Sequence, residues 1–300
     1  NFTSATNAYN TAVGDSAGNA ITTGQTNTLI GGLVGDAITV GGDNVGLGYK
    51  ALSVNTTGFY NVALGSRTLA NMNVTDSSAT YNVAVGYSAG NDVTTGTENT
   101  LIGALAGDAL TVGNTNVAIG THALSADTKG DRNVAIGRAA LQSQNFTSTT
   151  DSYNVAVGYG TGESITTGTL NTLIGGLAGD AITTGSSNVA VGYRSLSATT
   201  TASSNTAIGV DALTSNTTGI SNTAVGRDTL NQQTTASYNT ALGHQALNLN
   251  TSGTNNTASG YKALYANTTA ANNVAVGYHA LLANTTGTEN TAVGSDAGKA

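Results

Sequence analysis

Short stretches in which polar and apolar residues alternate return along the whole chain, and each ends at a glycine. Residues 82–86 read NVAVG, and residues 116–120 read NVAIG. Alternation with a period of two favours a short β-strand that carries Val, Ile or Leu on one face and Ala on the other. The pattern therefore predicts a series of short strands, each closed by a glycine.

The Asn-x-x-x-Gly pattern recurs at nearly constant spacing. Fourteen of its sixteen intervals are 17 residues, and the two that start at Asn61 and Asn133 are 21. A fixed period of this length is typical of solenoid proteins. The pattern begins at Asn10, Asn27, Asn44, Asn61, Asn82, Asn99, Asn116, Asn133, Asn154, Asn171, Asn188, Asn205, Asn222, Asn239, Asn256, Asn273 and Asn290.

A longer period of 72 residues overlies the short one. The inserted stretch NVTDSSATY (73–81) corresponds to NFTSTTDSY (145–153) and to the first nine residues, NFTSATNAY. We therefore expect residues 1–9 to be the end of a preceding inserted coil. Residues 10–300 are expected to form one continuous repeat array, truncated at both ends, with the 72-residue super-repeat clearest over 1–187.

Each 17-residue unit has the composition of a β coil. Gly, Thr-Thr and Val are all unfavourable inside helices, and the Thr-Thr segment favours a second short strand. Asn and Gly at fixed places are expected to form the corners, as at Asn82, Gly86, Asn99, Gly103, Asn116 and Gly120. The prediction is an all-β fold, a β-solenoid or β-roll of about seventeen 17-residue coils.

Two positions in the unit vary together. When the repeated Asn is position 1, position 12 is aliphatic wherever position 9 is Gly, and it is polar in nearly every unit where position 9 is Leu. The interior volume thus holds one branched side chain and not two. We expect these residues to stack in one core column: Ile21, Ile38, Leu52, Val93, Leu110, Leu124, Ile165, Ile182, Leu196 and Leu213.

Composition points to a chain that associates with itself. Two or three aliphatic side chains per coil make a thin core, because ordering one residue costs about 1–2 kcal/mol in backbone entropy. Ala stands at position 3 in thirteen of the seventeen units, and we expect these residues to form a smooth strip against which another chain packs. Bundling of two or three copies would compensate for the thin core.

Charge and apolar runs exclude other partners. Charged residues make up only 8 % of the chain, the net charge is −7, and there are nine Lys and Arg. Nucleic-acid binding needs clustered cations, so we expect none. No apolar run reaches the eighteen or so residues of a membrane span.

We find no constellation of residues that carries catalysis. His122, His244 and His279 are not paired at metal-ligand spacing. Asp36, Asp108 and Asp180 recur 72 residues apart, which is four coils or about 19 Å at the strand spacing, and this is too far for an acid/base pair. We therefore expect no enzyme activity, no metal and no cofactor.

Tyrosines and sequons leave two questions open. The tyrosines after the repeated glycine either shield the corners or offer exposed rings to a partner; five of these are Tyr87, Tyr159, Tyr193, Tyr261 and Tyr278. Glycosylation of Asn or Thr is possible, although repetition of NTTG makes most sequons by-products of the corner. The sequons start at Asn1, Asn55, Asn73, Asn145, Asn216, Asn250, Asn255, Asn267 and Asn284.

The units NVAVGYSA, NVAIGRAA and NTAIGVDA resemble the head repeats of trimeric autotransporter adhesins. The longer NTAVG…AL…NTTG unit is similar to repeats of phage tail-fibre proteins. The resemblance implies a parallel homotrimeric fibre, exposed at a cell or virion surface and used for attachment or as a spacer.

Two functions follow as expectations. The first is an extracellular structural fibre or adhesin shaft, a stiff homotrimeric spacer for surface attachment, with surface glycans or a receptor as further partners and continuation end to end. The alternative is a ligand-binding solenoid that recognises glycans or ice through exposed Thr and Tyr columns. Because Thr-Thr is adjacent, its two side chains are expected to point to opposite faces, which leaves a single outward Thr column.

Overall fold

The computed structural model describes residues 8–299, so most of the expected inserted coil at residues 1–9 lies outside the described residues. The chain folds into two compact units, one that ends at Tyr153 and one that begins at Asn154. Each unit is a parallel β-solenoid, and the turns number about 17 in all. Among residues 8–299, no helix is long and apolar enough to cross a membrane.

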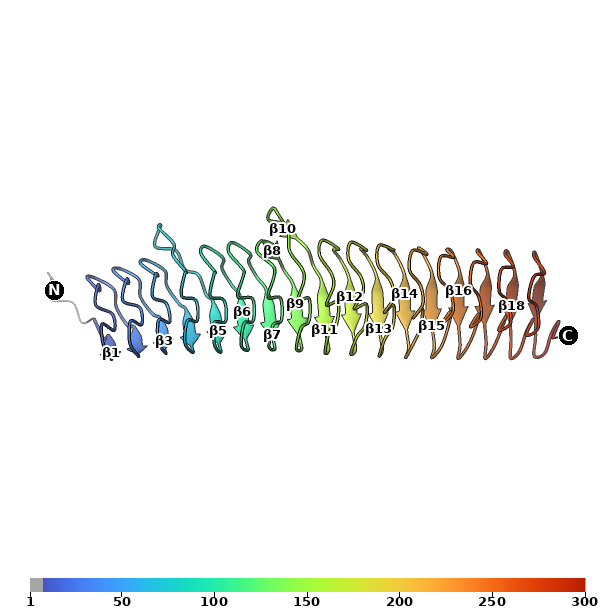
Figure 1. Ribbon diagram of the computed structural model, residues 1–300, viewed down its shortest axis with the longest axis horizontal. Helices are drawn as coiled ribbons and strands as arrows, with labels where there is room; N and C mark the ends of the chain where they lie inside the picture. The colour runs from blue at the N-terminus through green and yellow to red at the C-terminus, as the bar shows by residue number, and fades with distance from the viewer. Residues whose placement is uncertain (1–7, 300) are drawn as a thin grey trace. The chain divides into compact units, whose positions relative to one another are not determined.

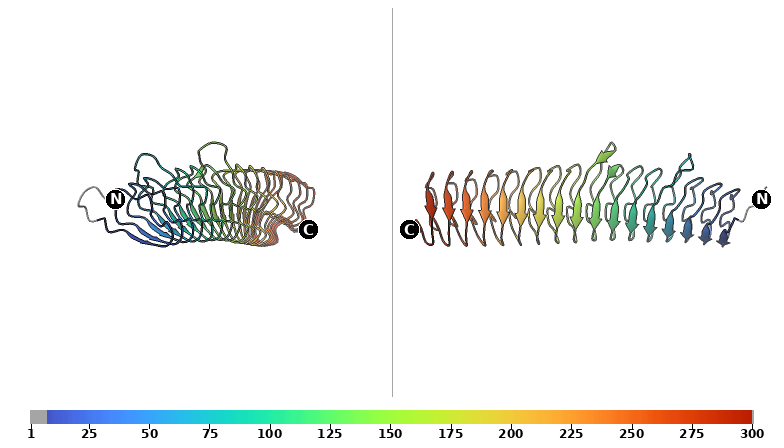
Figure 2. Two further views of the ribbon diagram at one scale, coloured as in Figure 1. Left: turned by 60° about the vertical axis from the view of Figure 1, so that its left-hand side comes forward. Right: turned by 180° about the vertical axis from the view of Figure 1, so that it is seen from behind.

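Each turn contributes one three-residue strand, and each strand pairs in parallel with the strand of the next turn. Equivalent positions are in register, as in the pairs Ala63–Ala84 and Ala207–Ala224. Figure 2 shows the strands of each unit along one side of its turns. The first unit contains β1 (Thr11–Val13), β2 (Thr28–Ile30), β3 (Val45–Leu47), β4 (Val62–Leu64), β5 (Val83–Val85), β6 (Thr100–Ile102), β7 (Val117–Ile119) and β9 (Val134–Ile136).

The second unit repeats this arrangement without an insertion. Its strands are β11 (Val155–Val157), β12 (Thr172–Ile174), β13 (Val189–Val191), β14 (Thr206–Ile208), β15 (Thr223–Val225), β16 (Thr240–Leu242), β17 (Thr257–Ser259), β18 (Val274–Val276) and β19 (Thr291–Val293). In the first unit, the second inserted loop adds β10 (Thr150–Asp151), which pairs with β8 (Gly130–Asp131) in the preceding turn.

The predicted second strand at Thr-Thr was wrong, because this segment is a bend. At Thr166–Thr167 the chain turns, yet the amide of Thr166 still donates to the carbonyl of Thr183 in the next turn (2.9 Å). The Thr166 hydroxyl donates to the same carbonyl (3.1 Å). The segment thus keeps the bonds between turns that a strand would make, but not the extended backbone.

The repeated Asn side chains point into the interior and form a continuous ladder in each unit. The Oδ1 of Asn82 accepts hydrogen bonds from the backbone amide (3.0 Å) and the Nδ2 (3.1 Å) of Asn99. The Nδ2 of Asn99 also donates to the carbonyl of Gly113 (2.9 Å), and its Oδ1 accepts from the amide of Asn116 (3.0 Å). Asn82, Asn99 and Asn116 are buried, so the residues expected at the corners lie inside the coil.

The glycine that closes each strand is required for two reasons. Gly86, Gly103 and Gly120 have φ of 129°, 132° and 133°, a region that side chains other than glycine rarely adopt. A Cβ on Gly86 would also lie 2.7 Å from the carbonyl carbon of Gly103, because the backbones of successive turns approach closely there. These three glycines do form the corner at the end of the strand.

Positions 9 and 12 of the unit occupy one interior volume. A Cβ on Gly35 would lie 2.8 Å from the Cδ1 of Ile38, and a Cβ on Gly179 would lie 2.8 Å from the Cδ1 of Ile182. Ile21 is half-buried. The other nine residues of the expected core column are fully buried: Ile38, Leu52, Val93, Leu110, Leu124, Ile165, Ile182, Leu196 and Leu213.

The polar residues at position 12 are buried as well, except Asn284, which is half-buried. Where Leu fills position 9, the amide at position 12 turns toward the backbone of the following bend. The Nδ2 of Asn267 donates to the carbonyl of Ala270 (3.0 Å) and to the Oδ1 of Asn250 in the preceding turn (3.0 Å). Four sequon asparagines are buried, so a glycan cannot be attached to them in the folded chain: Asn55, Asn216, Asn250 and Asn267.

Removal of one rung of the Asn ladder should destabilise the solenoid strongly. Asn222→Ala deletes the acceptor of the Asn239 amide (3.0 Å) and the donor to the Ala236 carbonyl (2.9 Å), both of them buried. We expect a loss of about 2–5 kcal/mol in the free energy of unfolding, measured by urea denaturation. Thr218→Ala, an exposed position in the bend before Asn222, is the control, and an equal loss in both variants would contradict a structural ladder.

The shared volume predicts that two damaging substitutions compensate each other. Leu213→Gly leaves a cavity and Asn216→Ile overpacks against Leu213, each at a cost of about 1–4 kcal/mol. The double variant reproduces the Gly and Ile pair found at Gly35 and Ile38. A double-mutant cycle of unfolding free energies should show a favourable coupling of about 1–3 kcal/mol. Additive losses would mean that the two positions fill separate spaces.

Candidate functional site

The two faces of each strand are reversed from the expected arrangement. Ala84 and Ala207, at position 3, are fully buried, whereas the β-branched residues at positions 2 and 4 point outward. The reason is the Asn ladder: once the side chain at position 1 points inward, period-two alternation turns position 3 inward as well. The expected surface strip of alanines was therefore wrong, and alanine lines the interior.

The surface that results, which we call the outer sheet face, carries Val, Ile or Leu at position 4 of nearly every turn and Val or Thr at position 2. It comprises the side chains at positions 2 and 4 of every turn. Ile174 is 41 % exposed, Ile208 39 % and Val276 38 %. With strands of three residues spaced about 4.8 Å apart, the outer sheet face of each unit covers roughly 400 Å².

In each unit, the position-4 side chains of the outer sheet face form a row that is aliphatic in nearly every turn. Contiguous apolar patches on soluble monomers rarely exceed a few hundred Å². At roughly 400 Å² in each unit, the outer sheet face lies at the upper end of this range. In the middle of the second unit, the outer sheet face is Val189, Val191, Thr206, Ile208, Thr223, Val225, Thr240 and Leu242.

Tyrosines border the outer sheet face, because they follow the glycine that ends each strand. Their rings are about half exposed, so they do not close over the corners. Tyr261 stacks on Tyr278 of the next turn, with ring centroids 5.4 Å apart and planes 13° apart. The exposed fractions are 54 % for Tyr87, 56 % for Tyr159, 51 % for Tyr193, 39 % for Tyr261 and 51 % for Tyr278.

The Thr-Thr pair lies along another edge of the turn. Because the segment bends, both side chains of Thr166–Thr167 reach the surface, and the expected opposite orientation was wrong. The first hydroxyl of the pair is engaged, since it donates to the carbonyl one turn on, as Thr183 does to Thr200 (3.1 Å). The second Thr, as at Thr184, Thr201 and Thr218, is exposed and forms a single column.

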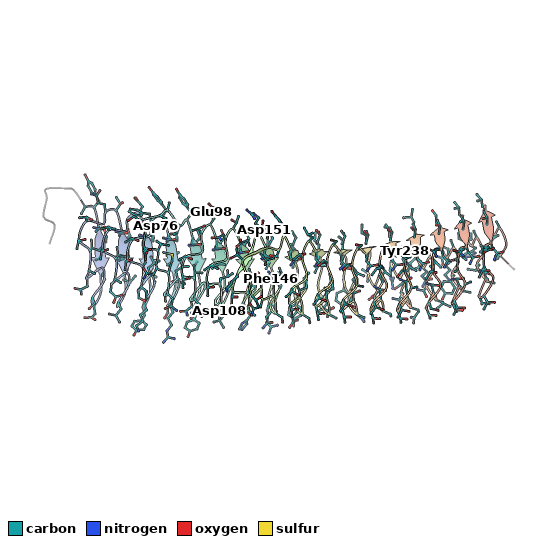
Figure 3. All side chains as sticks on the ribbon, turned by 90° about the horizontal axis from the view of Figure 1, so that it is seen from above. Asp76, Glu98, Asp108, Phe146, Asp151 and Tyr238 are labelled. Atoms are coloured by element: carbon teal, nitrogen blue, oxygen red, sulfur yellow. The ribbon has the colours of Figure 1, made fainter. Side chains whose placement is uncertain are left out.

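Two of the histidines each lie beside a single carboxylate. Within residues 8–299, no group of three His, Asp or Glu is placed to hold a metal. His244 lies 3.7 Å from Asp228, and His279 lies 3.5 Å from Asp296, as separate surface pairs. Asp108 lies on the opposite side of the ribbon from Glu98 (Figure 3).

The recurring aspartates are partly buried turn residues. Burial raises the pKa of the Asp108 and Asp180 carboxyls above the usual 3.8, and one oxygen of each accepts no hydrogen bond. Each of them belongs to a different compact unit. The carboxylate of Asp92 adds to the rise of the Asp108 pKa, and that of Glu163 adds to the rise of the Asp180 pKa, each as a weaker cause than burial.

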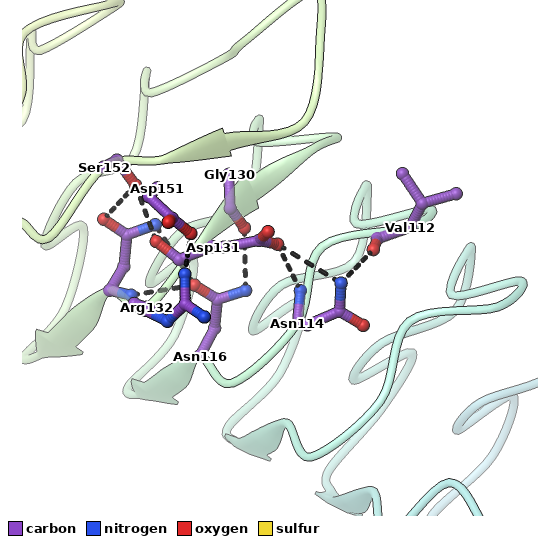
Figure 4. A network of polar contacts seen from close by, with 9 residues as sticks. Val112, Asn114, Asn116, Gly130, Asp131, Arg132, Asp151 and Ser152 are labelled. Carbon is purple, nitrogen blue, oxygen red and sulfur yellow. Dashed lines mark hydrogen bonds and ion pairs between the residues drawn. The ribbon is translucent and has the colours of Figure 1, made fainter.

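The second inserted loop is held by a polar network (Figure 4). Arg132 forms an ion pair with Asp151. The Asp131 carboxylate accepts a hydrogen bond from the amide of Asn114 (2.7 Å), and the Ser152 hydroxyl donates to the Oδ1 of Asn133 (2.8 Å). These contacts attach the inserted loop to the turns that precede it, so the network is structural.

Asp127 is the one buried carboxylate in the position-12 column. Its Oδ2 accepts from the Nε2 of Gln144 (2.7 Å), and its Oδ1 accepts from the amide of Gly130 (3.0 Å). Burial raises the pKa of the Asp127 carboxyl above 3.8, and these hydrogen bonds oppose the rise. The charged form is therefore disfavoured in the folded protein.

Models of known protein families and curated proteins were compared with the sequence, and neither comparison finds a match.

The raised pKa of Asp127 predicts a pH-dependent gain from its amide analogue. A carboxyl whose pKa is raised on folding stabilises the fold below its unfolded pKa, and this stability is lost as the pH rises through the folded pKa. Asp127→Asn, which matches Asn55 and Asn216 in other turns, should thus raise the melting temperature at neutral pH. The gain should disappear below about pH 3.8. A gain that persists in acid, or a loss at neutral pH, would contradict this reading.

Proposed function

We propose that the chain is a non-enzymatic structural shaft of an extracellular fibre or adhesin, built from three parallel copies. The observation that carries the proposal is the outer sheet face, an apolar surface that runs turn after turn. Three copies with these faces turned toward a common axis would remove the β-branched side chains from water. The burial would contribute about 25 cal/mol per Å² of apolar surface, which compensates for the thin interior of each coil.

The pattern of hydrogen bonds supports a spacer role. Along each unit the backbone groups of one turn are bonded to the next turn, so no strand edge runs along the side of the solenoid. The many threonine and asparagine side chains leave the surface polar with few charges, which suits a shaft that contacts little except its own copies. The resemblance to trimeric adhesin and tail-fibre repeats supports three as the number of chains and a cell or virion surface as the location.

Substitution of a lysine on the outer sheet face should separate the copies. We expect the wild-type protein to sediment at about three times the chain mass of 29.6 kDa. Ile208→Lys combined with Val225→Lys places two cations in the apolar interface, where burial of unpaired charge costs several kcal/mol, so this variant should sediment as one chain. Both side chains point outward, so circular dichroism should show that the fold is retained.

Thr218→Lys adds a charge on the bend, away from the outer sheet face, and should leave the assembly intact. A wild-type protein that remains a single chain at micromolar concentration would contradict the proposed shaft. So would assembly of the double lysine variant.

A further inference from the structure

The first unit has a surface pocket with a volume of about 310 Å³. It spans the turns that begin at Asn44, Asn61 and Asn82 and is formed by residues that follow the strand, at positions 7, 10 and 11. Its lining includes two cations, Lys50 and Arg67, with Ser53, Ala70, Asn71 and Asn91. A pocket of this size lies at the small end of ligand sites, and it is large enough for one sugar residue rather than only a simple ion.

A small residue creates the pocket. Position 10 is Ala70 in the central turn, whereas the neighbouring turns carry Ser53 and Asn91 at the same position. The Ser53 hydroxyl donates to the carbonyl of Ala70 (3.2 Å), which holds the floor of the pocket in place. Asn at position 10 occurs in other turns, at Asn19 and Asn231, so the missing side chain at Ala70 is a local feature.

The two cations are unusual in this chain. The protein carries nine Lys and Arg in all and a net charge of −7. Within residues 8–299, the Lys and Arg residues that form ion pairs are Arg132, Arg194, Arg227 and Lys299. Neither Lys50 nor Arg67 lies within ion-pair distance of a carboxylate in this range. Two unpaired cations in successive turns, at one pocket, give it a local positive charge that favours an anion.

The remaining groups suit a polyhydroxylated ligand. Asp92, the nearby carboxylate, accepts hydrogen bonds from the Nδ2 of Asn71 (2.9 Å) and of Asn91 (2.7 Å). The carboxamide oxygens of these two asparagines are thereby left as acceptors for hydroxyl groups. Beside the pocket, Tyr49 is 49 % exposed, and the Lys50 Nζ lies 5.5 Å from its ring centroid. Gly32 and Ser66 stand at the position of Tyr49 in the adjacent turns, so the ring has small neighbours along the solenoid.

We propose that this pocket binds an acidic sugar, a pyranose that bears a carboxylate. The carboxylate lies between Lys50 and Arg67, the sugar hydroxyls bond to Asn71 and Asn91, and the apolar face of the ring packs against Ala70. This inference does not depend on the proposed shaft, because the pocket lies within one chain and uses no residue of the outer sheet face. It adds a ligand class to the chain whether or not copies associate.

The test is titration of the full chain with glucuronate, followed by NMR of the labelled protein, with glucose and inorganic sulfate as comparison ligands. We expect saturable chemical-shift changes with glucuronate. The affinity for glucose and for sulfate should be at least about tenfold lower, because glucose lacks the carboxylate and sulfate lacks the sugar hydroxyls. Arg67→Gln should weaken glucuronate binding at least about tenfold, as loss of one charge-assisted hydrogen bond does. Ala70→Asn, which fills the pocket with a side chain that other turns tolerate, should abolish it.

Lys262→Gln is the matched control, because Lys262 is a position-7 cation in the other unit. This variant should bind glucuronate as the wild type does. Equal affinity for sulfate, equal affinity for glucose, no saturation, or equal loss in Lys262→Gln would each overturn the proposal. The sedimentation mass of the same samples reports on assembly separately, so failure of the pocket and failure of the shaft are distinguishable.

Discussion

The inward Asn ladder is the interaction on which the rest of the structure depends. Each repeated Asn side chain has two donors and an acceptor in the interior. In most turns its Nδ2 donates to the Oδ1 of the preceding Asn and to a backbone carbonyl, and its Oδ1 accepts hydrogen bonds from the next Asn, as at Asn99. Asn205, for example, bonds to Asn188 on one side and to Asn222 on the other. An unpaired buried amide costs about 1–3 kcal/mol of stability. A turn of another length would bring a different residue to position 1 and would therefore destabilise the fold. The period of the sequence follows from this requirement, and the longer interval that starts at Asn61 leaves the ladder of its unit continuous, because the amide of Asn82 donates to the Oδ1 of Asn61 (3.1 Å).

The ladder also decides which residues face water. With Asn at position 1 pointing inward, the alternation along the strand places Ala at position 3 inside and the larger Val, Ile and Leu residues at positions 2 and 4 outside. The interior is narrow and is filled by Ala, one Leu or Ile from positions 9 and 12, and amides. The chain therefore keeps small residues in its core and displays its β-branched residues, which is the reverse of an ordinary β-protein. This reversal motivates the proposal that the outer sheet face is covered by further copies of the chain.

Much of the fold could be predicted from the repeat. The parallel β-solenoid, the number of turns and the shared volume of Gly35 with Ile38 follow from periodicity and from covariation between two positions. The direction of the side chains could not be predicted from hydrophobicity, because Val85 looks more suited to a core than Ala84 does. The residue that decides the direction of the side chains is Asn82. The sequence pattern predicts its polar side chain at a corner, whereas the structure buries it. An uninterrupted column of identical amides, which bond to one another only when they are stacked inside, was the signal for the opposite orientation.

Other features depend on three-dimensional contacts that a single repeat does not reveal. The bend at Thr166–Thr167 keeps the bonds of a strand through its amides and hydroxyls, so β propensity alone predicted the wrong backbone. The amide of Asn267 is buried because the bend at Ala270 offers it a carbonyl. The pocket at Ala70 arises from one small residue between two larger ones in neighbouring turns, which is visible only when the turns are stacked.

A cryo-EM cross-section of the purified protein at side-chain resolution would test the central claim most directly. The account predicts three chains per layer, with the Asn columns inside each chain and the Val and Ile columns of the outer sheet faces turned toward a common axis. A single chain per layer with Val and Ile in solvent would contradict the assembly. Val and Ile inside each coil, with Asn at its surface, would contradict the ladder itself.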